Sequence, residues 1–236
     1  MKEEYLRWFS PNLSRDFEML TFGHSGYPII LFPTSQGRYY ENKDFQLINS
    51  VQHFIEDGLV KIFCPDSIDS LSWYNHTVPP ALRVKNHQSY ERMLLDEVVP
   101  KALSETDKNK VVVAGCSFGG YHAANFAFKH PELVSHLFSM SGVFDIRNQL
   151  DGFYNDDVYF NNPVDYLPRA NNTELWNLKI VLGSAERDVC RYDNENLSSI
   201  LYHKGMSHWL DIRHDTDHDW VVWREQFPCY LGKLYY

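Results

Sequence analysis

Short apolar runs alternate with helical patterns along this chain, and the alternation limits its fold more than any other feature of the sequence. The runs are rich in β-branched residues and almost continuously hydrophobic, as strands covered on both faces of a sheet are. They are YPIILF (27–32), LVKIFC (59–64), KVVVAG (110–115), HLFSMSG (136–142) and LKIVLGS (178–184). Apolar residues at helical spacing occupy 44–57, 86–104 and 194–204 between them.

This order of elements predicts a mostly parallel sheet with helices on both faces. The segment FEMLTFG (17–23), a glycine-containing turn and YPIILF (27–32) resemble a hairpin, which would place antiparallel strands at one edge. We therefore expect the α/β class. The architecture would be a three-layer α/β/α fold with a mostly parallel central sheet and an antiparallel N-terminal edge.

The length of 236 residues suits one sizeable domain, and no repeat or low-complexity linker divides the chain. We expect a single domain over 1–236. The stretch 143–177 contains QLDGFYNDDVYFNNP and shows no clear period. We expect a structured excursion above the sheet there, which is a candidate lid or roof of a pocket.

Charge and composition exclude several classes of function. A net charge of −9 opposes binding to a nucleic-acid backbone. The first residues, MKEEYLRWFS, contain acidic residues where a signal peptide needs basic ones, and no apolar run approaches the length of a membrane span. We expect a cytoplasmic protein that does not bind membranes. The four cysteines form no C-x-x-C pair and are expected to be free thiols: Cys64, Cys116, Cys190 and Cys229.

The most specific chemical signal is GCSFG (115–119), a G-x-S-x-G motif between a strand of valines and a helix that Pro131 ends. A serine on a tight strand-to-helix turn needs small neighbours, because its backbone is strained. We expect Ser117 to be a nucleophile and the backbone N–H of Phe118 to face a developing oxyanion. The alternative is an ordinary glycine-rich turn.

A nucleophilic serine needs a base and an orienting acid, and in a fold of this kind they follow in the chain order serine, acid, histidine. Glu186 and Asp188 follow the strand at 178–184, and we favour Asp188. His218 lies between the expected last strand (207–213) and a helix that Asp219 could cap, so we favour it as the base. His214 is its main competitor.

The run HDTDHDW (214–220) could instead hold a metal ion. His214 and His218 would share a face only on a helix, whereas Asp215 to Asp217 after a strand are typical of a turn. No second cluster of Cys or His shows ligand spacing. We therefore expect no metal site.

The second oxyanion donor should come from the loop PTSQG (33–37). A backbone N–H requires no particular side chain, so Thr34 and Gln36 stay open beside our choice, Ser35.

A substrate pocket could use the segment SIDSLSWYNH (67–76), which follows a strand. Trp73, Tyr74 and His76 are candidates there, although aromatic side chains could equally pack in the core. Weaker candidates of the same kind lie in the excursion: Phe153, Tyr154 and Tyr159.

These motifs resemble the esterase D family of α/β-hydrolases. The similarity covers nearly the whole chain, and 143–177 fits least well. It is carried by YLRWFSPNLSRDFEMLTFGHSGYPIILFPTSQGRYYEN, by SYERMLLDEVVPKAL, by GCSFGGYHAANFAFKHPELVSHLFSMSG and by GSAERDVCRYDNENLSSILYHKGMSHWLDIRHDTDHDWVVWREQF. The loop FPTSQG departs from the His-Gly pair of many relatives.

The resemblance implies the α/β-hydrolase fold, Ser117 as nucleophile, Asp188 as acid, His218 as base, and no cofactor. The expected protein is a serine esterase that cleaves a small-molecule carboxylic ester through an acyl-enzyme. A thioesterase or acyltransferase with the same triad, or a non-catalytic binding protein on this fold, is the alternative. The substrate stays open, as does assembly into a homo-oligomer.

Overall fold

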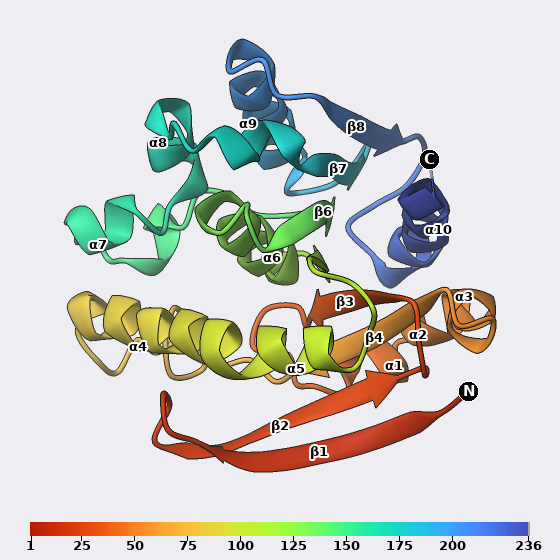
Figure 1. Cartoon of the computed structure of the whole chain (residues 1–236). Helices are drawn as coiled ribbons and strands as arrows, with labels where there is room; N and C mark the ends of the chain where they lie inside the picture. The colour runs from red at the N-terminus through yellow and green to blue at the C-terminus, as the bar shows by residue number, and fades with distance from the viewer. Residues whose placement is uncertain (236) are drawn as a thin grey trace.

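The computed structural model describes residues 1–235, and an eight-stranded sheet forms its centre (Figure 1). The strands lie in the order β1-β2-β4-β3-β5-β6-β7-β8. Their bounds are β1 (Glu3–Ser10), β2 (Arg15–Phe22), β3 (Tyr27–Phe32), β4 (Val60–Pro65), β5 (Val111–Cys116), β6 (Val134–Met140), β7 (Lys179–Ala185) and β8 (His208–Arg213).

The six strands from β4 across to β8 pair in parallel, and β1 and β2 form the antiparallel N-terminal edge. The expected α/β class and the mixed sheet are confirmed. The expected hairpin of 17–23 with 27–32 is wrong. β2 pairs with β1 and β4, whereas β3 lies between β4 and β5, because the buried strand β3 needs a parallel neighbour on each side.

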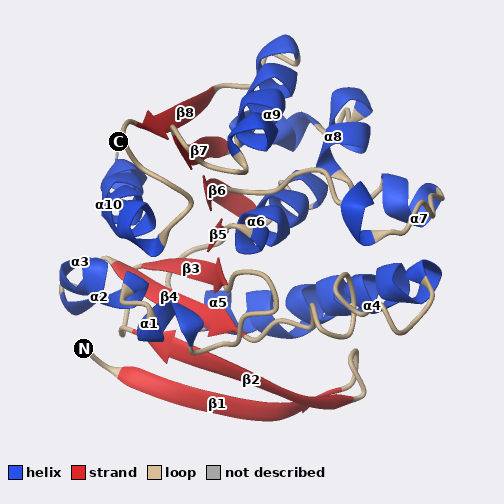
Figure 2. Ribbon diagram, turned by 180° about the vertical axis from the view of Figure 1, so that it is seen from behind, coloured by secondary structure: helices blue, strands red, loops and turns tan. Residues whose placement is uncertain are grey.

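Helices cover both faces of the sheet (Figure 2). One apolar cluster joins the helices α4, α5, α6 and α9 to one face, and a second joins α2, α3 and α10 to the other. β5 shows why its sequence is continuously apolar: Val111 and Val113 belong to the first cluster, and Val112 and Ala114 belong to the second.

The helices have these bounds: α1 (Glu41–Asp44), α2 (Leu47–Ser50), α3 (Gln52–Glu56), α4 (Pro80–Met93), α5 (Val99–Ser104), α6 (Phe118–Lys129), α7 (Asp156–Tyr159), α8 (Pro163–Tyr166), α9 (Arg191–His203) and α10 (Trp220–Leu231). A π-helical turn, Leu94–Val98, joins α4 to α5, and four short 3-10 helices lie at Arg147–Gln149, Leu167–Arg169, Thr173–Asn177 and Gly232–Tyr235.

Two expected helices differ from the simple pattern. The segment 44–57 is divided, because Gln46 adopts a left-handed φ of 65° that no helix interior accommodates. The segment 86–104 belongs to a longer helical run with a π turn just before Pro100, whose missing N–H cannot continue the α-helical hydrogen bonds.

The excursion 143–177 is built of short helices that lie against α4, α6 and α9 (Figure 1). Its buried side chains Ile146, Leu150 and Val158 form a third cluster with residues such as Trp73 and Phe118. This packing fixes the excursion to the helix layer. Within residues 1–235, no helix combines the length and the apolar character that crossing a membrane requires.

Candidate active site

The turn between β5 and α6 carries Ser117 in a strained conformation, with φ 54° and ψ −123°. Its glycine neighbours are required by close approaches of the backbone. A Cβ on Gly115 would lie 2.3 Å from the carbonyl group of Gly119, and a Cβ on Gly119 would lie 2.5 Å from the Pro33 carbonyl oxygen. The second distance also shows that the helix after Ser117 lies directly against the loop 33–37.

A continuous chain of hydrogen bonds runs from Ser117 through His218 to Asp188. The Ser117 Oγ lies 3.0 Å from His218 Nε2, although the two residues are 101 positions apart. His218 Nδ1 lies 2.7 Å from Asp188 Oδ1. The Asp188 side chain is fully buried, whereas the His218 side chain is 22% exposed. The structure thus brings together the three residues that the sequence singled out.

The carboxylate of Asp188 is held by more than the histidine. The Ser184 hydroxyl donates to its Oδ2 at 3.0 Å, and the backbone N–H of Cys190 donates to its Oδ1 at 2.8 Å. Burial alone would raise the pKa of Asp188, but hydrogen bonds from His218, Ser141 and the Cys190 N–H outweigh it and lower the pKa. The carboxylate is therefore charged at neutral pH.

The indole ring of Trp223 packs against the imidazole of His218. The two rings are 5.0 Å apart at 87°, an edge-to-face contact. The Trp223 indole N–H donates to the Ser141 hydroxyl at 2.8 Å. Asp219 caps α10 by accepting from the Val221 N–H, as its position in the sequence predicts. Trp223 and Ser141 carry no sequence signal of their own, because only the folded chain brings them to Asp188 and His218.

The competing residues lie outside this chain of hydrogen bonds. Glu186 accepts from the backbone N–H of Asp215 at 3.0 Å and lies 3.7 Å from His214. The His214 side chain is 85% exposed. These contacts hold the loop 214–217 against Glu186. His218, and not His214, is the histidine that lies beside Ser117.

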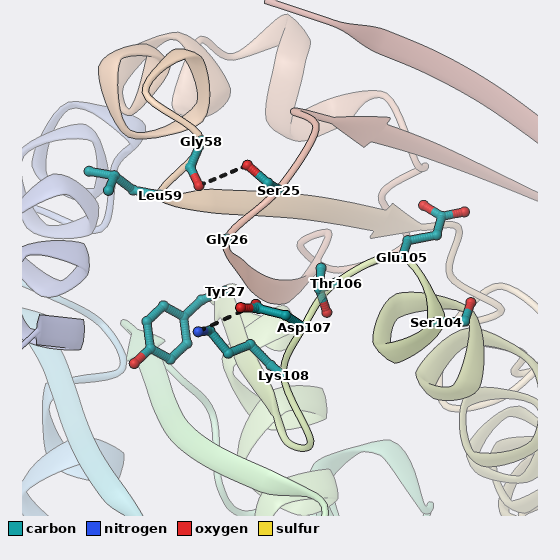
Figure 3. A pocket seen from close by; sticks show the side chains of 10 residues that line it. All are labelled: Ser25, Gly26, Tyr27, Gly58, Leu59, Ser104, Glu105, Thr106, Asp107 and Lys108. Atoms are coloured by element: carbon teal, nitrogen blue, oxygen red, sulfur yellow. Dashed lines mark hydrogen bonds and ion pairs between the residues drawn. The ribbon is translucent and has the colours of Figure 1, made fainter.

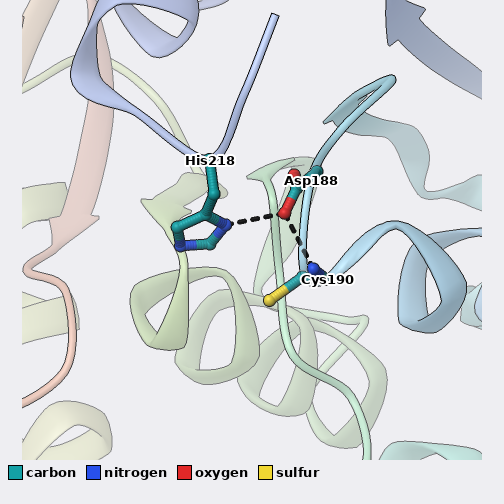
Figure 4. Close-up of side chains that lie close together, drawn as sticks. All are labelled: Asp188, Cys190 and His218. Atoms are coloured by element: carbon teal, nitrogen blue, oxygen red, sulfur yellow. Dashed lines mark hydrogen bonds and ion pairs between the residues drawn. The ribbon is translucent and has the colours of Figure 1, made fainter.

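Within residues 1–235, one group of side chains has metal-ligand chemistry: Asp188, Cys190 and His218, with donor atoms within 4.8 Å of one another (Figure 4). The carboxylate and the imidazole are already joined by the 2.7 Å hydrogen bond. Burial and the charges of Asp188 and Asp193 raise the pKa of Cys190 to about 12, which favours the neutral thiol over the metal-binding thiolate. The donor set fits a hydrogen-bonded pair better than a resident metal.

The loop 33–37 contains one backbone N–H without a partner. Thr34 and Gln36 donate to carboxylates, at 2.7 Å to Glu41 and 3.1 Å to Asp69. In the part of the chain that the structure describes, neither the Ser35 N–H nor the Phe118 N–H has a hydrogen-bond acceptor.

The three residues predicted to line a substrate pocket lie in three different environments. Trp73 is a correction: its side chain is 0% exposed and packs against His87 and Tyr121, so the aromatic ring serves the core. His76 is exposed and lies 3.8 Å from Asp151. Of the three, Tyr74 alone reaches the loop 33–37, where its hydroxyl donates to the Ser35 Oγ at 2.9 Å.

A separate cavity of about 660 Å³ lies at the opposite end of the strands (Figure 3). It is bordered by Tyr27 at the start of β3, by Leu59 just before β4, and by the turn 104–108 before β5. Ligands of parallel α/β sheets bind outside the carboxyl ends of the strands. This cavity therefore lies at the wrong end to serve Ser117.

Comparison with known proteins gives the family of the chain. The model of the family described as "Putative esterase" matches residues 51–234. A 1-acylglycerol-3-phosphate O-acyltransferase of Arabidopsis thaliana is 30% identical over 139 residues, which cover 56% of this chain and 30% of that protein. The chain thus spans about a third of the length of this relative.

Solved structures of hydrolases share the fold over nearly all of their length. A ferulic acid esterase superposes with a TM-score of 0.80 at 17% identity, covering 99% of this chain and 97% of that one. The fluorophosphonate-binding serine hydrolase F of Staphylococcus aureus gives 0.74 at 14% identity, covering 99% and 98%. An S-formylglutathione hydrolase of Agrobacterium tumefaciens gives 0.75 at 11% identity, covering 98% and 93%.

The family model covers well over half of the chain, and the superpositions share the α/β-hydrolase architecture. The chain therefore belongs to the family described as "Putative esterase" and has the α/β-hydrolase fold.

Proposed function

We propose that the chain is a serine esterase in which Ser117 is the nucleophile, His218 the general base and Asp188 the orienting acid. The observation that carries the proposal is the unbroken chain of hydrogen bonds, 3.0 Å from Ser117 to His218 and 2.7 Å from His218 to Asp188. A hydroxyl at neutral pH is a weak nucleophile unless a base within hydrogen-bond reach accepts its proton.

In the proposed cycle, His218 Nε2 accepts the Ser117 proton as Oγ bonds to the ester carbonyl carbon. The tetrahedral intermediate collapses when the C–O bond to the alcohol breaks and His218 returns the proton to the leaving oxygen. Water then attacks the acyl-enzyme by the same route and releases the acid. The charged Asp188 fixes the proton on Nδ1 and stabilises the imidazolium that forms.

The oxyanion would lie between the backbone N–H groups of Phe118 and Ser35. Phe118 is the first residue of α6, so its N–H has no helical acceptor and the positive end of the helix dipole faces the developing charge. Donors fixed before the reaction stabilise the transition state without reorganising during it.

The variant Ser117→Ala tests the proposal against simple aryl acetates. We expect kcat to fall by roughly 10⁴-fold or more, because the nucleophile is lost while the binding site is kept. A fluorophosphonate probe should label the parent chain and not the variant. Ser199→Ala, on an exposed part of α9, is the matched control and should retain full activity. Unchanged turnover of Ser117→Ala would contradict the assignment.

Acyl transfer and thioester hydrolysis are two alternative activities that would use the same three residues. The likeness to the Arabidopsis 1-acylglycerol-3-phosphate O-acyltransferase supports acyl transfer to an alcohol as one alternative. The likeness to the S-formylglutathione hydrolase supports a thioester substrate as the other. A panel of acyl esters and thioesters, with and without a glycerol-like acceptor, separates them by the ratio of free acid to transferred acyl group. If the fluorophosphonate probe fails to label Ser117, the non-catalytic alternative holds.

A small-molecule ester as substrate, one domain over 1–236 and a cytoplasmic location complete the proposal. Sedimentation of the purified protein gives the number of subunits, and fractionation of cells gives the location.

A further inference from the structure

Two carboxylates bind the loop 33–37 on either side of Ser35. Glu41 accepts from both the backbone N–H and the hydroxyl of Thr34, at 2.7 and 2.9 Å. Asp69 accepts from the Gln36 N–H at 3.1 Å. The peptide groups before and after Ser35 are thus fixed by side chains, and the Ser35 N–H between them is left without an acceptor among the residues described.

Asp69 also joins this loop to the helix that follows Ser117. Its Oδ1 lies 2.8 Å from Nε2 of His122 on α6, and its Oδ2 accepts from Gln36. The two side chains are buried, at 0% exposure for Asp69 and 3% for His122. One carboxylate therefore connects the two segments that carry the unpartnered N–H groups of Ser35 and Phe118.

The surroundings of His122 are aromatic. Its ring lies 5.2 Å from Phe118, edge to face, and 5.7 Å from Phe32, the last residue of β3. Burying a carboxylate and an imidazole costs free energy, and apolar side chains of similar volume are often as stable. Packing alone therefore gives no reason for a polar pair here, whereas the Gln36 N–H needs the acceptor that Asp69 supplies.

The backbone of the loop needs such an anchor. Gln36 has a left-handed φ of 57°, which a residue with a side chain seldom adopts without support. The Tyr74 hydroxyl donates to the Ser35 Oγ at 2.9 Å, which holds the Ser35 side chain in place. Every contact around Ser35 fixes its position and none occupies its donor.

We propose that Asp69, paired with His122, and Glu41 are positioning residues that form a two-carboxylate clamp and hold the Ser35 N–H as the second oxyanion donor. The proposal rests on the serine esterase function proposed above. The clamp acts on the transition state, because a carbonyl oxygen in the bound ester carries little charge. Its loss should therefore lower kcat and leave KM nearly unchanged.

The test measures kcat and KM for aryl acetates together with the affinity for a phenylboronic acid, which forms a tetrahedral adduct with a serine. In Asp69→Ala we expect kcat to fall by about 10²-fold, KM to stay within threefold, and boronic acid affinity to fall in parallel with kcat. Asp69→Asn should recover most of the loss, since its oxygen can accept from Gln36 and its amide can donate to His122.

The chain offers a matched control on the same helix layer. Glu91 on α4 accepts from His130, just after α6, at 2.6 Å and pairs with Lys129. Glu91→Ala removes a half-buried carboxylate–histidine pair that touches no part of the loop 33–37. It should lower the melting temperature about as much as Asp69→Ala does, with unchanged kcat for the folded protein.

A double-mutant cycle tests the role of His122. His122→Phe keeps an aromatic ring but leaves Asp69 with one partner, and we expect kcat to fall about tenfold. The pair Asp69→Ala/His122→Phe should be no slower than Asp69→Ala alone, because both changes release the same loop. Fully additive losses would overturn the link through Asp69.

Failure of the clamp and failure of the proposed function give different results. If Ser117→Ala keeps its turnover, the function itself is wrong. If Ser117→Ala is inactive while Asp69→Ala keeps kcat and boronic acid affinity within threefold of the parent, the clamp is overturned and the function stands. Equal kcat losses in Asp69→Ala and Glu91→Ala would also overturn it, because they would show a loss of stability alone.

Discussion

At Gly119 the first turn of α6 lies directly against the backbone of the loop 33–37 and leaves no room for a side chain. In Gly119→Ala the new Cβ would meet the carbonyl oxygens of Pro33 and Phe32 at 2.5 and 2.8 Å, and neither backbone can yield cheaply. We expect the loop to be displaced, with kcat at least tenfold lower and the free energy of unfolding lower by about 1–3 kcal/mol. Kinetics and chemical denaturation measure the two effects.

Gly232→Ala is the control for this change, since a Cβ at Gly232 meets nothing within 4 Å. Its activity should equal that of the parent. Equal activity in Gly119→Ala would show that the close contact of helix and loop is not needed for turnover.

Single residues are predictable from the sequence where the connectivity of the fold sets a chain order. Ser117, Asp188 and His218 follow the order serine, acid, histidine, and the fold brings them within hydrogen-bonding distance. Asp69 and His122 are not predictable as a pair. They lie 53 positions apart, and no sequence motif links a carboxylate in a loop to a histidine on a distant helix. Trp73 was misplaced because a buried and a pocket-lining aromatic residue look alike in sequence.

At the scale of elements, one carboxylate fixes the edge strand β1 to the helix layer. Glu97, in the π turn between α4 and α5, accepts from Trp8 Nε1 at 2.5 Å, Ser10 Oγ at 2.7 Å and Asn12 Nδ2 at 2.8 Å. The π turn thus provides the docking point for a strand that has a neighbour on one side only. The same contacts lie at the end of β1 that leads into the turn to β2.

Glu97→Ala should release this edge. Three donors lose a charged acceptor, so we expect the free energy of unfolding to fall by about 2–4 kcal/mol and amide exchange to accelerate in β1 before the rest of the sheet. Hydrogen exchange followed by mass spectrometry measures the order. Because no atom of β1 belongs to the site, kcat should be unchanged. Uniform acceleration across all strands would contradict a local role.

The sequence predicts strand positions better than strand neighbours. The apolar runs match β3 to β7 within about two residues, because continuous hydrophobicity marks a strand buried on both faces. Which run pairs with which is set by how the helices pack on each face, and the runs look alike. For that reason β3 was assigned to the wrong partner, although the parallel sheet and its antiparallel edge were predicted correctly.

For the whole molecule, buried histidines predict sensitivity to acid. Burial, with a smaller effect of Lys179, lowers the pKa of His136 from 6.5 to about 4, and burial lowers that of His87 well below 6.5. Each imidazole is neutral in the fold and gains a proton on unfolding. Their contribution to stability is therefore complete above pH 6.5 and is lost as the pH falls towards 4.

The variant His136→Phe keeps the contacts with the rings of Tyr27 and Phe138 but cannot titrate. Its free energy of unfolding should fall less between pH 6.5 and 4 than that of the parent, by up to about 3 kcal/mol. Urea titrations at several pH values measure the slope. The exposed His214→Gln should follow the parent, and parallel curves for all three proteins would rule out this source of acid sensitivity.

The distance along the chain between Ser117 and His218 has a consequence for refolding. The segment between them includes β6, β7 and β8, so the imidazole reaches the hydroxyl only after these strands have joined the sheet. Turnover cannot return before that event, whereas far-ultraviolet circular dichroism recovers with local helices. The rate at which ester hydrolysis returns in a denaturant-jump experiment should therefore report the rate at which β8 pairs with β7.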